Sequence, residues 1–97
     1  MRWYYYLHTN GDLIGKNPAV VDSDASYFDS DFVRKVWLIT SREKLIRMLV
    51  QAKELGARAE RIKAIEEKST VTEKDYECLR RIDAGEDQEK VVAEIFG

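Results

Sequence analysis

Residues 32–55 read FVRKVWLITSREKLIRMLVQAKEL, and this stretch predicts one strand that runs directly into one amphipathic helix. Residues 33–40 are rich in β-branched, aromatic and aliphatic side chains, as is typical of strands. Because side chains alternate along a strand, its two faces are Phe32, Val36 and Leu38 on one side and Val33, Trp37 and Ile39 on the other. Both faces are largely apolar, so we expect an inner strand that is covered on both sides at its C-terminal half.

Residues 41–55 carry apolar side chains at spacings of three and four, which predicts the helix. The apolar stripe consists of Leu45, Met48, Leu49, Ala52 and Leu55, widened by Ile46 and Val50. Ser41 stands where an N-cap belongs, because its hydroxyl can accept a hydrogen bond from a first-turn amide. Gly56 follows the last apolar position as a natural C′ residue. The stripe needs a sheet face to cover, and the preceding strand is the nearest candidate.

Two further strands are predicted at residues 2–8, RWYYYLH, and 12–16, DLIGK, with Asn10-Gly11 between them. Asn-Gly most readily adopts the positive φ angles of a two-residue type I′ turn. With this pair at the centre, Leu7 faces Ile14 and Tyr5 faces Lys16. The expected core face is then Trp3, Tyr5, Leu7 and Ile14, and the other face is Tyr4, Tyr6, His8 and Leu13.

Residues 17–31, NPAVVDSDASYFDSD, contain no basic residue and predict a long acidic loop, in which residues 19–21 extend the second strand after Pro18. Its acidic residues after that extension are Asp22, Asp24, Asp29 and Asp31. Spaced aspartates can occupy a basic groove on another protein. They also form turns with their own backbone, and the residues favour this ordinary solvated loop.

The rest of the chain is predicted to be helical. Residues 57–68 either continue the preceding helix through a kink at Gly56 or form a helix of their own. Thr72 is a suitable N-cap for a helix that ends at Gly85, and residues 87–96 predict a last helix. We therefore expect an α+β fold in a single domain, residues 1–97, with a small antiparallel three-stranded sheet, one main packing helix and a helical C-terminal half. Residues 1–40 hold the hairpin, the acidic loop and the third strand, and residues 41–97 are the helical part.

The composition of the chain argues against a duplex-binding, a disulfide-bonded and a membrane protein. Charged residues make up 35% of the chain and the net charge is −2, which differs from the strongly basic footprint of a duplex-binding protein. With one cysteine, Cys78, no intrachain disulfide can form. The N-terminus has only a short aromatic run, which predicts neither a signal peptide nor a membrane span. We expect a cytoplasmic protein that does not associate with membranes.

No catalytic or metal site is predicted, and no cofactor. His8 is the one histidine, and neither it nor Cys78 has a spaced set of Cys, His or carboxylate residues around it. His8 is interpreted as a surface residue next to the hairpin turn. Cys78 is interpreted as a helix residue beside the apolar stripe rather than as a nucleophile. We therefore expect a protein that is not an enzyme.

The aromatic strand is denser in rings than a small core requires. Tyr4, Tyr6 and His8 project from one face, and such a face can stack bases of single-stranded nucleic acid. In that interpretation Arg2 and Arg34 would bind phosphates beside Tyr4 and Tyr6. A stacking platform needs more flanking basic residues than this, so a face covered by a helix or by a partner subunit is favoured.

One resemblance adds to this picture. The run WYYYLHTNGDLIGKNP, the acidic loop, SDFVRKVWLIT and a helix ending in LGA resemble small uncharacterised bacterial proteins often carried on prophages and mobile elements. The resemblance covers about residues 3–57 and implies an accessory protein of bacterial or phage origin. It implies no active-site motif.

Together these observations predict protein–protein interaction as the function. The expected contact surfaces are the aromatic face, with Tyr4, Tyr6 and His8, and the acidic loop, with Asp22, Asp24, Asp29 and Asp31. Homodimerisation is one form of this contact, because a three-stranded sheet has two edges and one uncovered face. The alternative is single-stranded nucleic-acid binding through Arg2, Tyr4, Tyr6 and Arg34.

Overall fold

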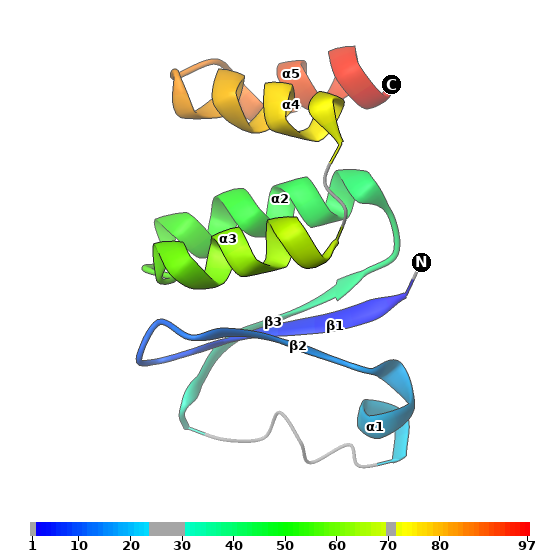
Figure 1. Cartoon of the computed structure of the whole chain (residues 1–97), viewed down its shortest axis with the longest axis vertical. Coiled ribbons are helices and arrows are strands. Elements are labelled where there is room, and N and C mark those ends of the chain that lie inside the picture. The colour runs from blue at the N-terminus through cyan, green and yellow to red at the C-terminus, as the bar shows by residue number, and fades with distance from the viewer. Residues whose placement is uncertain (1, 24–30, 70–71) are drawn as a thin grey trace.

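The computed structural model describes residues 2–23, 31–69 and 72–97. Within these residues, the strands are β1 (Trp3–His8), β2 (Leu13–Lys16) and β3 (Val33–Ile39). The helices are α1 (Pro18–Ser23), α2 (Arg42–Glu54), α3 (Ala59–Lys68), α4 (Glu73–Asp83) and α5 (Gln88–Phe96). Figure 1 shows α2 and α3 side by side over one face of the sheet, α4 and α5 as a further layer beyond them, and α1 at the opposite face. The predicted α+β fold is confirmed.

The sheet has three antiparallel strands in the order β2-β1-β3, so the aromatic strand β1 is central. The prediction that residues 33–40 form an inner strand covered on both sides is wrong, since β3 lies at an edge. Leu38 pairs with Tyr4 on the face away from α2 and is 40% exposed. The apolar residues Val36 and Leu38 on that face of β3 lie beside Tyr6 and Tyr4 of β1.

The hairpin register differs by one residue from the prediction, because three residues rather than two form the turn. The His8 amide donates to the Asp12 carbonyl over 2.8 Å, and the Gly11 amide donates to the His8 carbonyl over 2.9 Å. Gly11 has a φ of +93°, as the last residue of a three-residue hairpin loop requires. Leu7 therefore pairs with Leu13 rather than with Ile14.

This shift exchanges the two faces of β2, because side chains alternate along a strand. Leu13, 3% exposed, joins Tyr5 and Leu7 in the core, and Ile14 lies opposite Tyr6. The expected core positions of Trp3, Tyr5 and Leu7 are confirmed, whereas those of Ile14 and Leu13 are reversed. The absence of a side chain at Gly15 favours the observed register. A Cβ atom at Gly15 would lie 2.6 Å from Nε1 of Trp3, so the missing side chain makes room for the Trp3 ring.

Residues 19–21 are helical and do not extend β2 as predicted. Pro18 is the first residue of α1, a position at which its fixed φ and missing amide hydrogen are no disadvantage. The side-chain oxygen of Asn17 accepts a hydrogen bond from the Ala19 amide over 2.9 Å, as an N-cap does. Val21 is buried, and α1 contacts β1.

Helix α2 begins and ends as its sequence predicts. Ser41 Oγ accepts a hydrogen bond from the Lys44 amide over 3.2 Å, and Gly56 has a φ of +93°. Of the two alternatives for residues 57–68, the structure shows a separate helix, α3. The Arg58 amide donates to the Gly11 carbonyl over 2.9 Å, which ties the α2–α3 turn to the hairpin loop. Thr72 caps α4 and Asp87 caps α5.

Helix α2 is buried on two sides and joins the layers. One core cluster lies between the sheet, α2 and α3, and includes Leu7, Leu13, Ile39, Leu45, Met48, Leu49 and Ile65. A second cluster lies between α2, α4 and α5, and consists of Ile46, Cys78, Val91 and Val92. Because α3 and α4 both pack on α2, a groove lies between these two helices.

Candidate functional site: a groove between three helices

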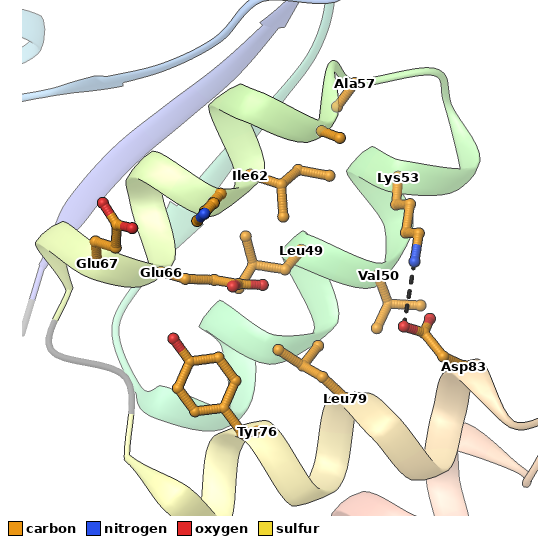
Figure 2. Close-up of a pocket in the computed structure, with 12 residues that line it drawn as sticks. Leu49, Val50, Lys53, Ala57, Ile62, Glu66, Glu67, Tyr76, Leu79 and Asp83 are labelled. Atoms are coloured by element: carbon orange, nitrogen blue, oxygen red, sulfur yellow. Dashed lines mark hydrogen bonds and ion pairs between the residues drawn. The ribbon is translucent and has the colours of Figure 1, made fainter.

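The groove runs between α3 and α4 over α2, and has a volume of about 530 Å³ (Figure 2). We refer to it as the inter-helix groove. Its larger apolar side chains are Leu49 and Val50 from α2, Ile62 from α3 and Leu79 from α4. They belong to the same stripes that hold the three helices together, and the groove lies where these stripes continue beyond the helix contacts. The site therefore has an apolar floor made by three elements.

Tyr76 forms one wall of the groove. Tyr76 is 41% exposed, so a large part of its ring is accessible from the groove. Figure 2 shows the ring standing on α4 with its hydroxyl pointing across the groove toward α3. A ring held on a helix in this way offers apolar area and one polar atom to a bound group at little cost in conformational entropy.

Charged side chains form the rim. Lys53 Nζ and Asp83 Oδ2 are 3.1 Å apart and connect α2 with α4 across one end of the groove (Figure 2). Both side chains are exposed, so this pair contributes at most about 1 kcal/mol to stability. Lys63, Glu66 and Glu67 of α3 complete the rim. Three acidic and two basic side chains give the rim a small net negative charge.

Glu66 differs from the other rim residues because its side chain extends over the apolar floor, in front of Leu49 (Figure 2). Burial raises the pKa of the Glu66 carboxyl; Lys53 opposes this shift, while Asp83 and Glu67 add to it. Among the residues that the structure describes, none forms a hydrogen bond or an ion pair with Glu66. The groove thus contains a partly desolvated carboxylate beside apolar surface.

On the predicted aromatic face, Tyr4 and Tyr6 lie beside apolar residues of β3. Tyr4 and Tyr6 pair with Leu38 and Val36 of β3, so these side chains share the sheet face that lies away from α2 and α3. The ring of His8 stacks on Phe32 with 5.8 Å between ring centroids. The Asn10 amide donates to His8 Nδ1 over 3.2 Å. His8 is therefore part of the packing around the hairpin end of the sheet.

The residues predicted for nucleic-acid binding do not all lie together. The Arg2 guanidinium carbon is 5.8 Å from the centroid of the Tyr4 ring. Arg34 instead donates to the Leu55 carbonyl over 2.8 Å, at the C-terminal end of α2. This contact directs Arg34 to the helix side of the sheet, so it does not join Tyr4 and Tyr6.

Of the predicted acidic positions, Asp31 is described and exposed, just before β3. Asp22 lies in α1, but its side chain is not among those described, and Asp24 and Asp29 fall outside the described residues.

Cys78 is fully buried in the second core cluster, and burial raises the pKa of its thiol. Its placement agrees with the interpretation of Cys78 as a packing residue. Within residues 2–23, 31–69 and 72–97, no three His, Cys, Asp or Glu residues group as metal ligands would. In the same part of the chain, no helix combines the length and the apolar character that crossing a membrane requires.

No protein-family model, curated protein or solved structure matches this chain. The resemblance of residues 3–57 to small bacterial and prophage proteins therefore stays a prediction.

The inter-helix groove was not predicted from the sequence. Its residues come from helices α2, α3 and α4 and from the turn between α2 and α3, and Glu66 and Tyr76 lie on opposite walls. A sequence signal did exist, since Glu66 follows Ile62 by four residues and so shares the inward stripe of its helix. A carboxylate on an apolar stripe can mark a site, but the sequence does not show which helix lies opposite.

Proposed function

We propose that this protein is a small non-enzymatic interaction module that binds a protein partner through the inter-helix groove. The observation that supports this proposal is an apolar groove of about 530 Å³, bounded by Leu79 and the half-exposed ring of Tyr76. Insertion of one leucine-sized side chain into such a groove contributes about 1.5–3 kcal/mol. Two or three such insertions, with a charged rim to fix orientation, are the usual basis of peptide recognition.

The proposal includes the biological setting predicted from the sequence. An accessory role in a bacterium or phage is supported by the resemblance of residues 3–57. A cytoplasmic location is supported by the single cysteine, whose thiol is free and buried. A second copy of the chain is one candidate partner, because β2 and β3 are the outer strands of the sheet that the described residues form.

Single-stranded nucleic-acid binding is the second candidate function. It is supported by Tyr4 and Tyr6 on one face, with Arg2 beside the Tyr4 ring. The placement of Arg34 at the end of α2 removes one of the two cations on which that hypothesis depends. We therefore favour the groove, whose apolar floor and charged rim lie together in the described residues.

Substitution of Tyr76 tests the groove directly. Tyr76→Lys removes the apolar wall and introduces a charge, but Tyr76 is half-exposed, so the fold should persist. Immobilised wild-type protein and variants are exposed to a lysate of the source organism, and retained proteins are quantified by mass spectrometry. We expect retention of the specific partner to fall about tenfold or more, the usual effect of losing an aromatic anchor.

Glu77→Gln is the matched control, because it changes the net charge by the same amount on the same helix. Glu77 is exposed and does not line the groove. We expect this variant to retain the partner as the wild type does. Identical retention by Tyr76→Lys and wild type would contradict the proposal.

A further inference from the structure

Among the described residues, three acidic residues are partly or fully buried, and two of them have arginine partners. Asp75 accepts hydrogen bonds from Arg42, and Asp12 lies within 3.4 Å of both Arg58 and Arg61. The third is Glu66, which has no such partner within the described residues. A partly desolvated carboxylate is unfavourable unless a cation or hydrogen-bond donors compensate it. Lys53 lowers the pKa of Glu66 but forms its ion pair with Asp83, so Glu66 is a position at which a cation from outside would fit.

The apolar surroundings of Glu66 favour a cationic side chain that lies among apolar side chains of the partner. Leu49 and Ile62 lie beside the carboxylate, and the ring of Tyr76 stands on the opposite wall (Figure 2). Apolar surface lowers the local dielectric and strengthens an ion pair formed there. An aromatic face within reach adds a favourable cation–π contact, particularly with the flat guanidinium of arginine.

The walls of the groove also limit the backbone conformation of the partner. They are the surfaces of α2, α3 and α4, whose backbone groups bond within each helix except at the helix ends. An extended peptide would find no strand edge here with which to pair its own backbone groups. A helix carries its hydrogen bonds internally and presents apolar side chains at spacings of three and four. The groove between two helices over a third is therefore suited to a helical segment.

We propose that the occupant of the inter-helix groove is an amphipathic helix of a partner protein, and that an arginine or lysine on its apolar face pairs with Glu66. This inference rests on the proposed function above and specifies its partner. The negative balance of the rim, from Glu66, Glu67 and Asp83 against Lys53 and Lys63, has the sign that favours such a cation.

A peptide library tests the proposal without knowledge of the natural partner. A displayed library of amphipathic helices of about 15 residues is selected on the wild-type protein, with all positions varied except an apolar stripe. Clones that lose binding to Tyr76→Lys but not to Glu77→Gln are groove binders. We expect these clones to share one basic position beside the stripe. Exchange of that position for glutamine should lower affinity about tenfold, the effect of about 1.4 kcal/mol.

Glu66→Gln keeps the shape of the side chain and removes its charge. We expect this substitution to lower the affinity of the groove binders about tenfold, and to have little further effect once the peptide's basic residue is glutamine. Selection on Glu66→Lys should no longer enrich a basic residue at that position. Glu77→Gln is again the control, because its carboxylate lies outside the groove.

A pH titration of the same complexes gives a second readout. Because the carboxyl of Glu66 must be ionised to bind a cation, affinity should fall as the pH falls through its raised pKa. The other titratable groups on the groove are Lys53, Lys63, Glu67, Tyr76 and Asp83. The part of the pH dependence of affinity that is absent in Glu66→Gln is due to ionisation of Glu66.

The outcomes separate the two proposals. If groove binders are recovered but carry no basic preference and bind Glu66→Gln as well as wild type, the pairing with Glu66 is overturned and the groove remains a docking site. If the binders are enriched in proline and adopt no helix, the helical occupant is overturned. If no clone distinguishes Tyr76→Lys from wild type, the groove itself fails as a binding site.

Discussion

Asp75 is a fully buried carboxylate that joins two helices. Arg42 Nε of α2 donates to Asp75 Oδ2 over 3.0 Å, and the Thr72 amide donates to the same oxygen over 2.9 Å. Thr72 Oγ1 in turn accepts from the Asp75 amide, which completes a capping box. One side chain thus begins α4 and attaches it to α2, so the position of the Tyr76 wall depends on its neighbour Asp75.

We expect Asp75→Asn to lower the free energy of unfolding by about 2 kcal/mol at pH 7, because it removes the charge that Arg42 faces. Burial alone would raise the pKa of Asp75, but hydrogen bonds from Arg42 and Thr72 outweigh it and lower the pKa below the ordinary 3.8. The stabilisation is therefore complete above pH 3.8 and is lost as the pH falls through the lowered pKa. Urea unfolding as a function of pH measures both effects.

Glu73→Gln is the control for this change, since Glu73 is an exposed acid in the same first turn of α4. It should change the unfolding free energy by less than about 1 kcal/mol. Equal stability of Asp75→Asn and wild type at pH 7 would show that the Arg42 contact does not hold α4 in place.

At the scale of elements, the three strands and helices α2 to α5 were predictable because their signals are local, whereas α1 was not predicted. A run of β-branched, aromatic and aliphatic residues marked β3, the three-and-four spacing marked α2, and Thr72 marked the start of α4. The register of the hairpin was not predictable from Asn10-Gly11 alone, because turns of two and of three residues both use a glycine with positive φ. The choice is made by packing across the sheet, where Leu13 joins the core and Gly15 lies under Trp3.

Substitution of Gly15 distinguishes the two registers. In the observed register, a Cβ atom at residue 15 would lie 2.6 Å from the Trp3 ring nitrogen, so Gly15→Val should destabilise by about 1–3 kcal/mol. In the shifted register the side chain would point to the other face, and valine would stabilise the strand by up to about 1 kcal/mol. Ile14→Val, at the neighbouring position, should cost no more than about 1.5 kcal/mol. Urea midpoints give the sign, and a stabilised Gly15→Val would favour the shifted register.

At the scale of the whole molecule, the layered packing of the helices explains why the groove was not predicted from the sequence. The groove exists because α3 and α4 both pack on α2 and leave space between them (Figure 1). Periodicity predicts that each helix has an apolar stripe, but not which stripes remain partly uncovered once all have packed. Glu66 on α3 and Tyr76 on α4 line the same groove because both helices pack on α2. This proximity depends on tertiary packing, which the sequence pattern of each helix does not show.

The same arrangement makes α4 and α5 dependent on one face of α2. Ile46 is fully buried against Cys78, Val91 and Val92, whereas Leu45, its neighbour in sequence, faces the sheet cluster. Ile46→Ala should therefore cost about 2–4 kcal/mol and loosen the α4–α5 layer first. Hydrogen exchange should accelerate in α4 and α5 while β1 and β3 stay protected, and groove binding should weaken although Ile46 does not line the groove.

Leu45→Ala is the matched variant and should accelerate exchange in the sheet. Uniform acceleration in both variants would mean that the two core clusters unfold as one unit, and that α4 cannot move independently of the floor on which a partner would bind.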